Sequence, residues 1–430
     1  MFSERIYLVL NRGDIPYSGI IGLEIENNLD FKILGESYLE LLIKYGILRS
    51  TISQKNKNYF LNISLNSELG SYLEEITSLG EFSTLSELII NLKYNQLRDH
   101  GVKLFYRIRN DKIVDVVYRF HHSIFDGLSG LIFLDLLFRK YDSICDDVDF
   151  QLPDLKYMKA SELIHTKHAT SLFSKIKLST KAIFYVSKNL LFKPPMGVFN
   201  QGKYNDQHVR LYTEVLSPKI FDQISKAAIL INVSLIDILI TVIFRSYIEC
   251  DKKNFHKRVK VLFIINLREK SDLTLVGNLF TSSFLTLYPD KFSSLEAEML
   301  NVHRQIQDSV KAKYGIGSLY LLNKLNPSLN SIRKRANSNF RAANYQIASL
   351  GQFPNPGADS KSRKYKHVNL LSGECHLGPK PKLTSSFSIF VVNRRISLCM
   401  NYVENNLKTA EIANFMNIIQ KNLDQFLSPR

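Results

Sequence analysis

The sequence contains no tryptophan, few cysteines and no long apolar run. Its four cysteines, Cys145, Cys250, Cys375 and Cys399, are widely spaced and form no CxxC pair. This spacing indicates neither a disulfide framework nor a zinc site, so we expect no bound metal. A chain without a disulfide framework fits a reducing compartment, and the cytoplasm is the simplest such compartment.

No apolar run reaches the roughly 18 residues that would indicate a transmembrane helix. The nearest, residues 227–244, is interrupted by Asn232, Ser234 and Asp237. It predicts a buried helix with Ser234 as a candidate cap and Asp237 at the third position of the first turn. Residues 1–14 carry charges of both signs around a short apolar core. That is not the pattern of a signal peptide and instead predicts a first strand.

The chain does have an excess of positive charge, with 56 Lys and Arg against 40 Asp and Glu, a net charge of +16. This excess favours anionic partners: nucleic acid, a phosphorylated cofactor, an acidic carrier protein or an anionic membrane surface. A solvated basic surface without a partner fits equally well. Residues 331–341 and 361–367 are basic clusters. No nucleic-acid-binding motif accompanies them, so nucleic acid is the least favoured partner.

The length of 430 residues suggests two or three folding units, at roughly 100–200 residues each. Helical and strand patterns alternate in both halves, which predicts an α/β (α+β) protein with two lobes. We place the N-terminal lobe at residues 1–190 and the C-terminal lobe at residues 207–430. Residues 191–206, with a Pro-Pro pair and two glycines, are the expected linker.

Apolar spacing and turn residues predict the individual elements. Helices are expected over residues 30–48, 128–143, 218–232 and about 407–427, and strands over residues 209–217 and 258–268. Two hairpins are expected, one over residues 101–122 turning at Asn110-Asp111, the other over residues 385–405 turning near Asn393-Arg394. Residues 349–367, rich in Pro and Gly, are expected to form a long loop.

The segment HHSIFDG, residues 121–127, follows the second strand of the first hairpin. A histidine at a strand end can act as a general base near neutral pH, although a polar corner of an ordinary core has the same composition. In a continuous helix, Asp126 would lie on the same face as His122 and could pair with it. Gly127 and the preceding strand favour a tight connection instead, in which Asp126 points away and braces the loop.

HHSIFDG resembles the HHxxxDG motif of the chloramphenicol acetyltransferase-like superfamily. That group includes condensation domains of nonribosomal peptide synthetases, polyketide-associated and alcohol acyltransferases, plant hydroxycinnamoyl-type transferases and wax ester synthases. Three later segments follow in the order that the superfamily uses. INLREK (265–270) resembles its N-x-R segment, VGNLFTSSFLTL (276–287) its G-N segment, and ASLGQFP (348–354) its S-N-L-G segment.

The resemblance implies two similar lobes with an active-site tunnel between them. It implies that His122 is the general base, that His121 and Gly127 support it, and that no acyl-enzyme forms. Asp126 would be a structural brace paired with Arg268, and a buried carboxylate with a bidentate arginine is physically reasonable. The donor would be a thioester of coenzyme A or of the phosphopantetheine of an acidic acyl carrier protein. We expect no tightly bound cofactor and a monomeric protein.

Five further polar residues are candidates for functional or structural roles. Asn278 is a candidate tunnel-lining residue or a plain turn residue. Ser349 is a candidate hydrogen-bond donor to the tetrahedral oxyanion, or a turn serine. His376 is expected in a loop without a catalytic role. His165 and His168 have a metal-like spacing but no third ligand near them in the sequence, so we expect a solvated helix face.

The sequence also departs from some branches of the superfamily. It lacks the D-F-G-W-G segment of plant hydroxycinnamoyl-type enzymes, and Leu128 stands where peptide synthetases often have tryptophan. These departures favour a stand-alone acyltransferase of lipid or secondary metabolism, of the alcohol acyltransferase or wax-synthase-like branch. The alternatives are a stand-alone condensation enzyme forming amides between carrier-bound substrates, and an inactive binding protein that kept the fold. Peripheral membrane contact is compatible with all three.

Overall fold

The computed structural model describes residues 18–55, 58–63, 73–93, 100–190, 209–250, 259–269, 272, 274–288, 294–325, 331, 343–354, 365–377, 385–403 and 409–428. The predicted first strand over residues 1–14 and the predicted linker at residues 191–206 lie outside these ranges, as does most of both basic clusters. The division into lobes at that linker therefore stays a prediction.

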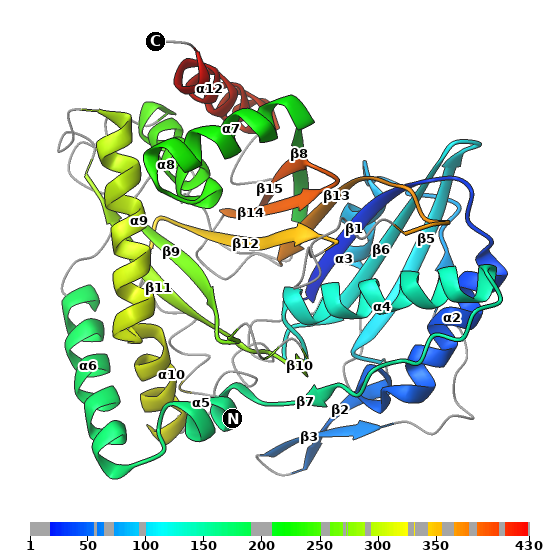
Figure 1. Cartoon of the computed structure of the whole chain (residues 1–430), viewed down its shortest axis with the longest axis horizontal. Coiled ribbons are helices and arrows are strands. Elements are labelled where there is room, and N and C mark those ends of the chain that lie inside the picture. Colours follow the sequence, from blue (N-terminus) through cyan, green and yellow to red (C-terminus); the bar gives the residue numbers. More distant parts are fainter. Residues whose placement is uncertain are drawn as a thin grey trace.

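The first half of the chain alternates strands and helices (Figure 1). Its elements are β1 (Ser18–Glu26), α2 (Phe31–Lys44), the short 3-10 helix η1 (Gly46–Arg49), β2 (Ser50–Lys55), β3 (Asn58–Ile63), β4 (Leu73–Glu75), α3 (Leu85–Asn91), β5 (Val102–Asn110), β6 (Ile113–His121), α4 (Gly127–Cys145), β7 (Lys156–Tyr157), α5 (Ala160–Lys167) and α6 (Leu172–Leu190).

The second half has the same kind of content. Its elements are β8 (Val209–Leu216), α7 (Pro218–Ile231), α8 (Leu235–Cys250), β9 (Val259–Asn266), β10 (Leu275–Val276), β11 (Phe280–Leu287), α9 (Leu295–Ala312), α10 (Tyr314–Leu325), β12 (Tyr345–Phe353), β13 (Leu370–Leu377), β14 (Ser385–Val392), β15 (Arg395–Val403) and α12 (Thr409–Leu427).

The first large sheet has the strand order β13-β1-β6-β5-β4 and carries the histidine segment at the end of β6. Alternate residues of β6 face opposite sides, as predicted from the period of two. Val114, Val116, Tyr118 and Phe120 enter the core formed with α2 and α4. Val117, on the other face, packs with residues of α3 and β8. The sheet therefore has a buried layer on each side near the end of β6.

The second large sheet has the order β11-β9-β12-β14-β15-β8. Its core is formed with the helices α7, α8, α9 and α12, which Figure 1 shows around the upper and left-hand parts of this sheet. Because α8 is buried along most of its length, it is the central helix of this half.

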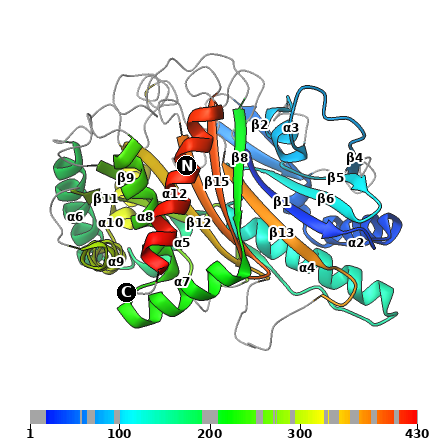
Figure 2. The same cartoon turned by 90° about the horizontal axis from the view of Figure 1, so that it is seen from above.

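β13 connects the two halves. It comes late in the chain, yet it pairs antiparallel with β1, from Gly19 opposite Leu377 to Ile25 opposite Leu370. Figure 2 shows it beside β1, at the junction with the strands of the second sheet. The first sheet is therefore completed by a strand from the second half of the sequence, which the alternation of elements did not predict.

Short-range sequence signals agree with the structure. The predicted helix at Pro218 begins there, and Ser217 caps it. Ser234 and Asp237 cap α8 reciprocally: the Ser234 N–H donates to Asp237 Oδ2 (2.8 Å), and the Asp237 N–H donates to Ser234 Oγ (3.2 Å). Asn393 and Arg394 both have positive φ, at 47° and 61°, which is the two-residue turn that the second hairpin needs.

Two local predictions were wrong. The long loop expected from residue 349 does not begin there, because β12 continues to Phe353 and pairs with β14 through that residue. His376 lies in β13 rather than in a loop. In both places glycine and proline nearby suggested a break, while sheet pairing to distant strands holds the backbone extended.

The described residues contain no single helix that meets the length and composition expected of a membrane span. Only α7 and α8 taken together do so, as a pair bent by 103°.

Candidate active site

The histidine segment forms a tight turn between β6 and α4. The His121 N–H donates to Gly101 O (2.7 Å), and the His121 carbonyl accepts from the N–H groups of Ile124 (3.0 Å) and Phe125 (3.3 Å). Asp126 then has extended backbone and caps α4, because its side chain accepts from the Ser129 N–H. A strand end, a turn and a helix start thus fix the backbone on both sides of His122.

Both oxygens of the Asp126 carboxylate accept hydrogen bonds, and the donors are residues other than His122. Oδ1 accepts from the N–H (2.9 Å) and Oγ (2.8 Å) of Ser129, and from Arg268 Nη2 (3.1 Å). Oδ2 accepts from Arg268 Nη1 (2.7 Å) and from the Leu279 N–H (2.8 Å). The predicted pairing of Asp126 with Arg268 is therefore present, whereas a local His122–Asp126 pair is not among the hydrogen bonds of this carboxylate.

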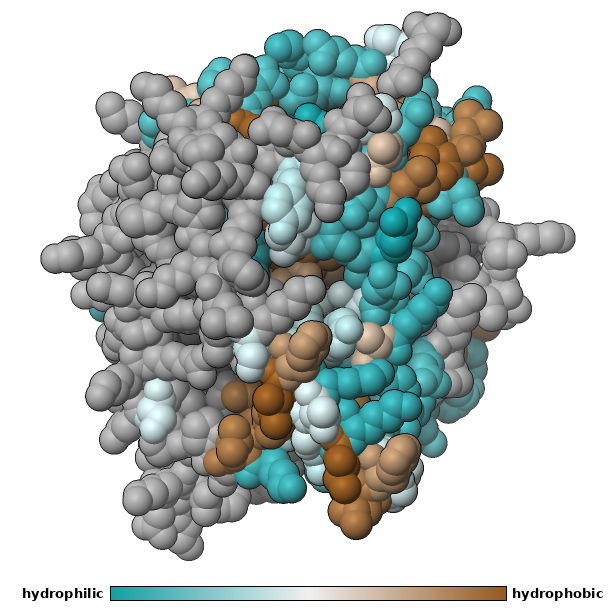
Figure 3. All heavy atoms as spheres, turned by 90° about the vertical axis from the view of Figure 1, so that its left-hand side faces the viewer, coloured by the Kyte–Doolittle hydropathy of each residue, from teal (hydrophilic) through white to brown (hydrophobic). Residues whose placement is uncertain are grey.

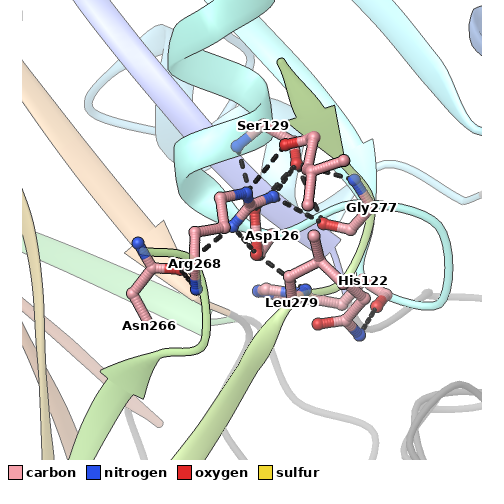
Figure 4. A network of polar contacts seen from close by, with 9 residues as sticks. His122, Asp126, Ser129, Asn266, Arg268, Gly277 and Leu279 are labelled. Atoms are coloured by element: carbon pink, nitrogen blue, oxygen red, sulfur yellow. Dashed lines mark hydrogen bonds and ion pairs between the residues drawn. The ribbon is translucent and has the colours of Figure 1, made fainter. Parts of the chain in front are cut away.

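Arg268 lies at the centre of this buried network (Figure 4). Besides Asp126, its guanidinium donates to acceptors from three further parts of the chain: Leu275 O (2.8 Å), Asn266 Oδ1 (3.2 Å), Ser129 Oγ (2.7 Å) and Gly277 O (3.2 Å). A planar group with five N–H donors can satisfy such a set, and a lysine ammonium could not. We call Asp126, Ser129 and Arg268, with the segment 275–279, the clasp.

The charges of the clasp compensate each other. Burial raises the pKa of Asp126, but the positive charge of Arg268 and hydrogen bonds from Arg268, Ser129 and Leu279 outweigh it, so the pKa lies below its ordinary value. Asp126 is therefore ionised at neutral pH. It cannot accept a proton during a reaction without losing this network, which fits a structural role.

Gly277 brings the segment 275–279 against α4. Its carbonyl accepts from the Asp126 N–H (3.2 Å), and its own N–H donates to Ser129 Oγ (3.0 Å). Its φ is +141°, and a Cβ atom here would lie 2.2 Å from Met158 O. Only glycine fits both the backbone angle and the close approach.

His122 is 2% exposed and lies between two aromatic rings. Its imidazole makes edge contacts with Phe120 and Phe280, at centroid distances of 5.4 Å and 5.7 Å. Its backbone carbonyl accepts from the side-chain amide of Asn278. His122, from the first half of the chain, is thus held by Asn278 and Phe280 from the second half (Figure 4 draws the hydrogen bond at its backbone). The role of Asn278 in substrate binding stays a prediction.

His121 has a different environment. Its Nδ1 accepts from the Ser123 N–H (3.1 Å), so its proton is on Nε2. Burial, together with the neighbouring His122 and Arg119, lowers the pKa of His121 to about 3. His121 is therefore neutral and has one fixed tautomer, which agrees with a supporting position next to His122.

Gly127 and the segment of Ser349 lie close together. A Cβ atom at Gly127 would lie 2.4 Å from Leu350 Cδ1, so this glycine makes room for β12 at the start of α4. β12 is irregular at this point, and the Gly351 N–H donates to Ser349 Oγ (3.3 Å). The structure thus brings Ser349 near the candidate site through its neighbour Leu350. Donation by Ser349 to an oxyanion stays a prediction.

Sequence reasoning missed Ser129, which contacts Asp126, Arg268 and Gly277 at once. A signal for its backbone was available, because the side chain of an aspartate cap accepts from an N–H two or three positions later, which is Ser129 here. It also missed the contribution of the backbone. The carbonyls of Leu275 and Gly277 carry no sequence signal, yet they accept from the Nε and Nη2 groups of Arg268.

His376 is not in the candidate site, but it is buried at the junction of the halves. Its Nε2 lies 3.1 Å from Glu374 Oε2, and its Nδ1 lies 2.6 Å from Asn401 Oδ1. Burial lowers the pKa of His376, but the charge of Glu374 and the hydrogen bonds around the ring outweigh it and raise the pKa to about 9. The pKa of Glu374 falls to about 2. The two form a partly buried ion pair at neutral pH, in which the His376 side chain is fully buried and the Glu374 side chain is 21% exposed.

His165 and His168, which have a metal-like spacing in the sequence, contact other side chains in the structure. The His165 ring makes an edge contact with Tyr320, and His168 Nδ1 lies 3.2 Å from Lys313 Nζ. Within the described ranges, no three His, Cys, Asp or Glu side chains are grouped so that they could hold a metal ion.

No protein-family model matches the sequence, and no curated protein matches it. Solved structures do match. The first condensation domain of the CDA synthetase superposes with a TM-score of 0.73 at 10% identity, over 100% of this chain and 94% of that one. Polyketide synthase associated protein 5 from Mycobacterium tuberculosis has a TM-score of 0.68 at 13% identity, over 100% and 97%. The starter condensation domain of rhizomide synthetase, in complex with C8-CoA, has a TM-score of 0.70 at 10% identity, over 98% and 92%.

At these identities the likeness shows the fold and leaves the activity open. It confirms the expected fold class, and the likeness covers nearly the full length of both chains in each case.

Proposed function

Since the chain has the condensation-domain fold, we propose that it is an acyltransferase in which His122 is the general base. The observation that carries the proposal is the position of His122, which lies at the end of β6 and is enclosed by Asn278 and Phe280 of the other half. A buried imidazole with a fixed backbone at the meeting point of two halves is suited to substrates that arrive from both sides.

The reaction that we propose is transfer of an acyl group from a thioester to a hydroxyl or amine. The His122 imidazole takes the proton of the acceptor while the acceptor oxygen or nitrogen attacks the thioester carbonyl. The resulting tetrahedral intermediate collapses, the carbon–sulfur bond breaks, and the thiolate leaves and takes up a proton. No covalent bond to the protein forms. The clasp keeps the turn that carries His122 in place.

We propose a coenzyme A thioester or an acyl carrier protein as donor, and a tunnel between the halves as the route to His122. Binding of C8-CoA by one solved relative of the same fold supports the first donor. The net charge of +16 supports any donor with phosphates or an acidic surface. Location in the cytoplasm and a monomeric state are part of the same proposal.

The test is a panel of acyl-coenzyme A donors with alcohol and amine acceptors, followed by thiol release and mass spectrometry of the products. His122→Ala should lower the transfer rate by about 10²–10⁴-fold, the usual contribution of a general base. His122→Gln preserves size and polarity without the base, and should lose the same activity with less effect on thermal stability. His165→Ala, on the exposed part of α5, is the matched control. Full activity of His122→Gln would refute the assignment.

A condensation enzyme acting between carrier-bound substrates is the second candidate, because condensation domains are among the solved structures of the same fold. The same panel separates the two. Amide formation with a carrier-bound donor, together with no reaction of any coenzyme A donor, would favour the condensation enzyme.

A further inference from the structure

Helix α6 has an apolar face that no other part of the described protein covers. Five large apolar side chains on it are exposed: Leu172, Phe173, Ile176, Ile183 and Phe184. Phe173 is 76% exposed and Phe184 is 67% exposed. A surface helix of a globular protein normally turns polar residues to the solvent, so this outward apolar face needs another explanation. We call these five residues the α6 face.

The α6 face is a continuous stripe. At 100° per residue, its five members fall within about one third of the helix circumference, and Thr180 lies among them. Leu178, Ala182 and Tyr185 occupy the opposite side and are buried, where α6 packs against α10. The helix is thus apolar on two faces, and only one of them belongs to the core. Figure 3, which views the side where α6 lies in Figure 1, shows hydrophobic side chains gathered in the lower part of this surface.

Lysines border the α6 face. Lys177 lies at one edge and Lys175 at the other, at the same 100° spacing, while Lys181 lies further round the helix and donates to Ala312 O (3.3 Å). Residues 172–190 include no Asp or Glu, and neither do residues 314–325 of α10, against which α6 packs. A stripe of Phe, Ile and Leu between lysines is the arrangement of helices that lie in the plane of an anionic membrane surface.

We propose that the α6 face docks on the surface of an anionic lipid bilayer. The Phe, Ile and Leu side chains enter the boundary between headgroups and acyl chains, and the lysines remain with the anionic headgroups. Phe173 and Phe184 are separated by about 16 Å along the helix, from the rise of 1.5 Å per residue. A bilayer accepts such an extended stripe without a complementary groove. A second copy related by a two-fold axis would bring the same basic edges together, which charge repulsion disfavours.

The test is flotation of the full chain with vesicles of phosphatidylcholine containing about 30% phosphatidylserine, compared with phosphatidylcholine alone. The wild type should bind the anionic vesicles, with weaker binding at high salt. Phe173→Ser combined with Phe184→Ser should weaken binding about tenfold or more, because two large apolar groups are lost. Lys175→Gln combined with Lys177→Gln should weaken binding to the anionic vesicles alone, by about fivefold per lysine.

The matched control is Ile229→Ser combined with Leu230→Ser on α7. These side chains are 79% and 86% exposed but do not belong to the α6 face. This variant should bind within about twofold of the wild type, since surface apolar groups elsewhere do not meet the bilayer. Thermal melting checks that every variant is folded, and the lysine variant changes no packing residue.

Three results would overturn the proposal. One is a wild type that binds neither kind of vesicle. Another is equal loss of binding in the α6 and α7 variants. The third is a wild type that fails to bind vesicles but forms a dimer, or a complex with an acyl carrier protein, that Phe173→Ser with Phe184→Ser abolishes. In that case the α6 face would be a protein interface. Vesicle binding needs no acyl transfer, so the outcome is independent of the proposed function.

Discussion

Replacing Asp126 with asparagine tests the clasp most directly, because asparagine keeps the size and removes the charge. Every hydrogen-bond partner of the two carboxylate oxygens is a donor. Ser129 and Arg268 donate to Oδ1, and Arg268 and the Leu279 N–H donate to Oδ2. The new NH₂ group must therefore face at least two donors, whichever way the amide turns. Arg268, which is buried, would keep its charge without a counterion.

The expected loss is about 3–5 kcal/mol in the free energy of unfolding, the usual cost of removing one partner of a buried ion pair. Arg109→Met is the matched control. Arg109 also pairs with two carboxylates, Glu24 (2.6 Å) and Asp115, but its side chain is 39% exposed. The pair with Glu24 is solvent-exposed and contributes about 0–1 kcal/mol. Asp115 is 13% exposed and also loses its partner, so this variant should lose more than that but less than Asp126→Asn.

Urea unfolding followed by circular dichroism measures both variants. The double variant Asp126→Asn with Arg268→Met should lose less than the sum of the single variants, because it leaves no buried charge unpaired. Equal and small losses for Asp126→Asn and Arg109→Met would refute the reasoning. Additive losses in the double variant would show that the two side chains do not act as a pair.

Two further predictions concern stability. Glu374 raises the pKa of His376 to about 9 against burial, so the stability that the pair contributes is present below pH 6.5 and is lost as the pH rises through 9. The free energy of unfolding of the wild type, from urea titrations, should fall across this window by up to about 3 kcal/mol, at about 1.4 kcal/mol per pKa unit. His376→Gln should lack this pH-dependent loss. If the two pH profiles are parallel, the ion pair does not stabilise the fold. Gly277→Ala should lower the melting temperature because its Cβ would meet Met158 O at 2.2 Å in a backbone with φ of +141°, and an unchanged melting curve would contradict that.

Features encoded over a few residues could be predicted from the sequence. The reciprocal cap of Ser234 and Asp237 and the turn at Asn393-Arg394 depend on neighbours within three positions. The alternation along β6 is equally local. Each of these patterns has its cause within one element, so no knowledge of the rest of the chain is needed.

Features made by distant segments were predicted only with help from the motif. Asp126 was expected to point at Arg268 because of the superfamily resemblance, and no spacing rule connects two residues so far apart. The wrong assignment of His376 to a loop has the same origin. Glu374 lies two positions before His376 on the same strand, but Thr213 and Asn401 come from β8 and β15, which meet β13 only in the folded protein. Hydrogen bonds between strands that are far apart in the sequence leave no periodic trace in it.

The position of β13 has a consequence for synthesis of the protein. β1 and β6 are made early, but the strand that covers the other edge of β1 follows about 250 residues after β6, which takes roughly 10–50 s at 5–20 residues per second. During that time the nascent first sheet has an open edge of unpaired N–H and C=O groups, and such edges pair with other strands. Ribosome-bound chains that stop before residue 370 should therefore bind a chaperone more strongly than chains extended past residue 403, in which β13, β14 and β15 are all present.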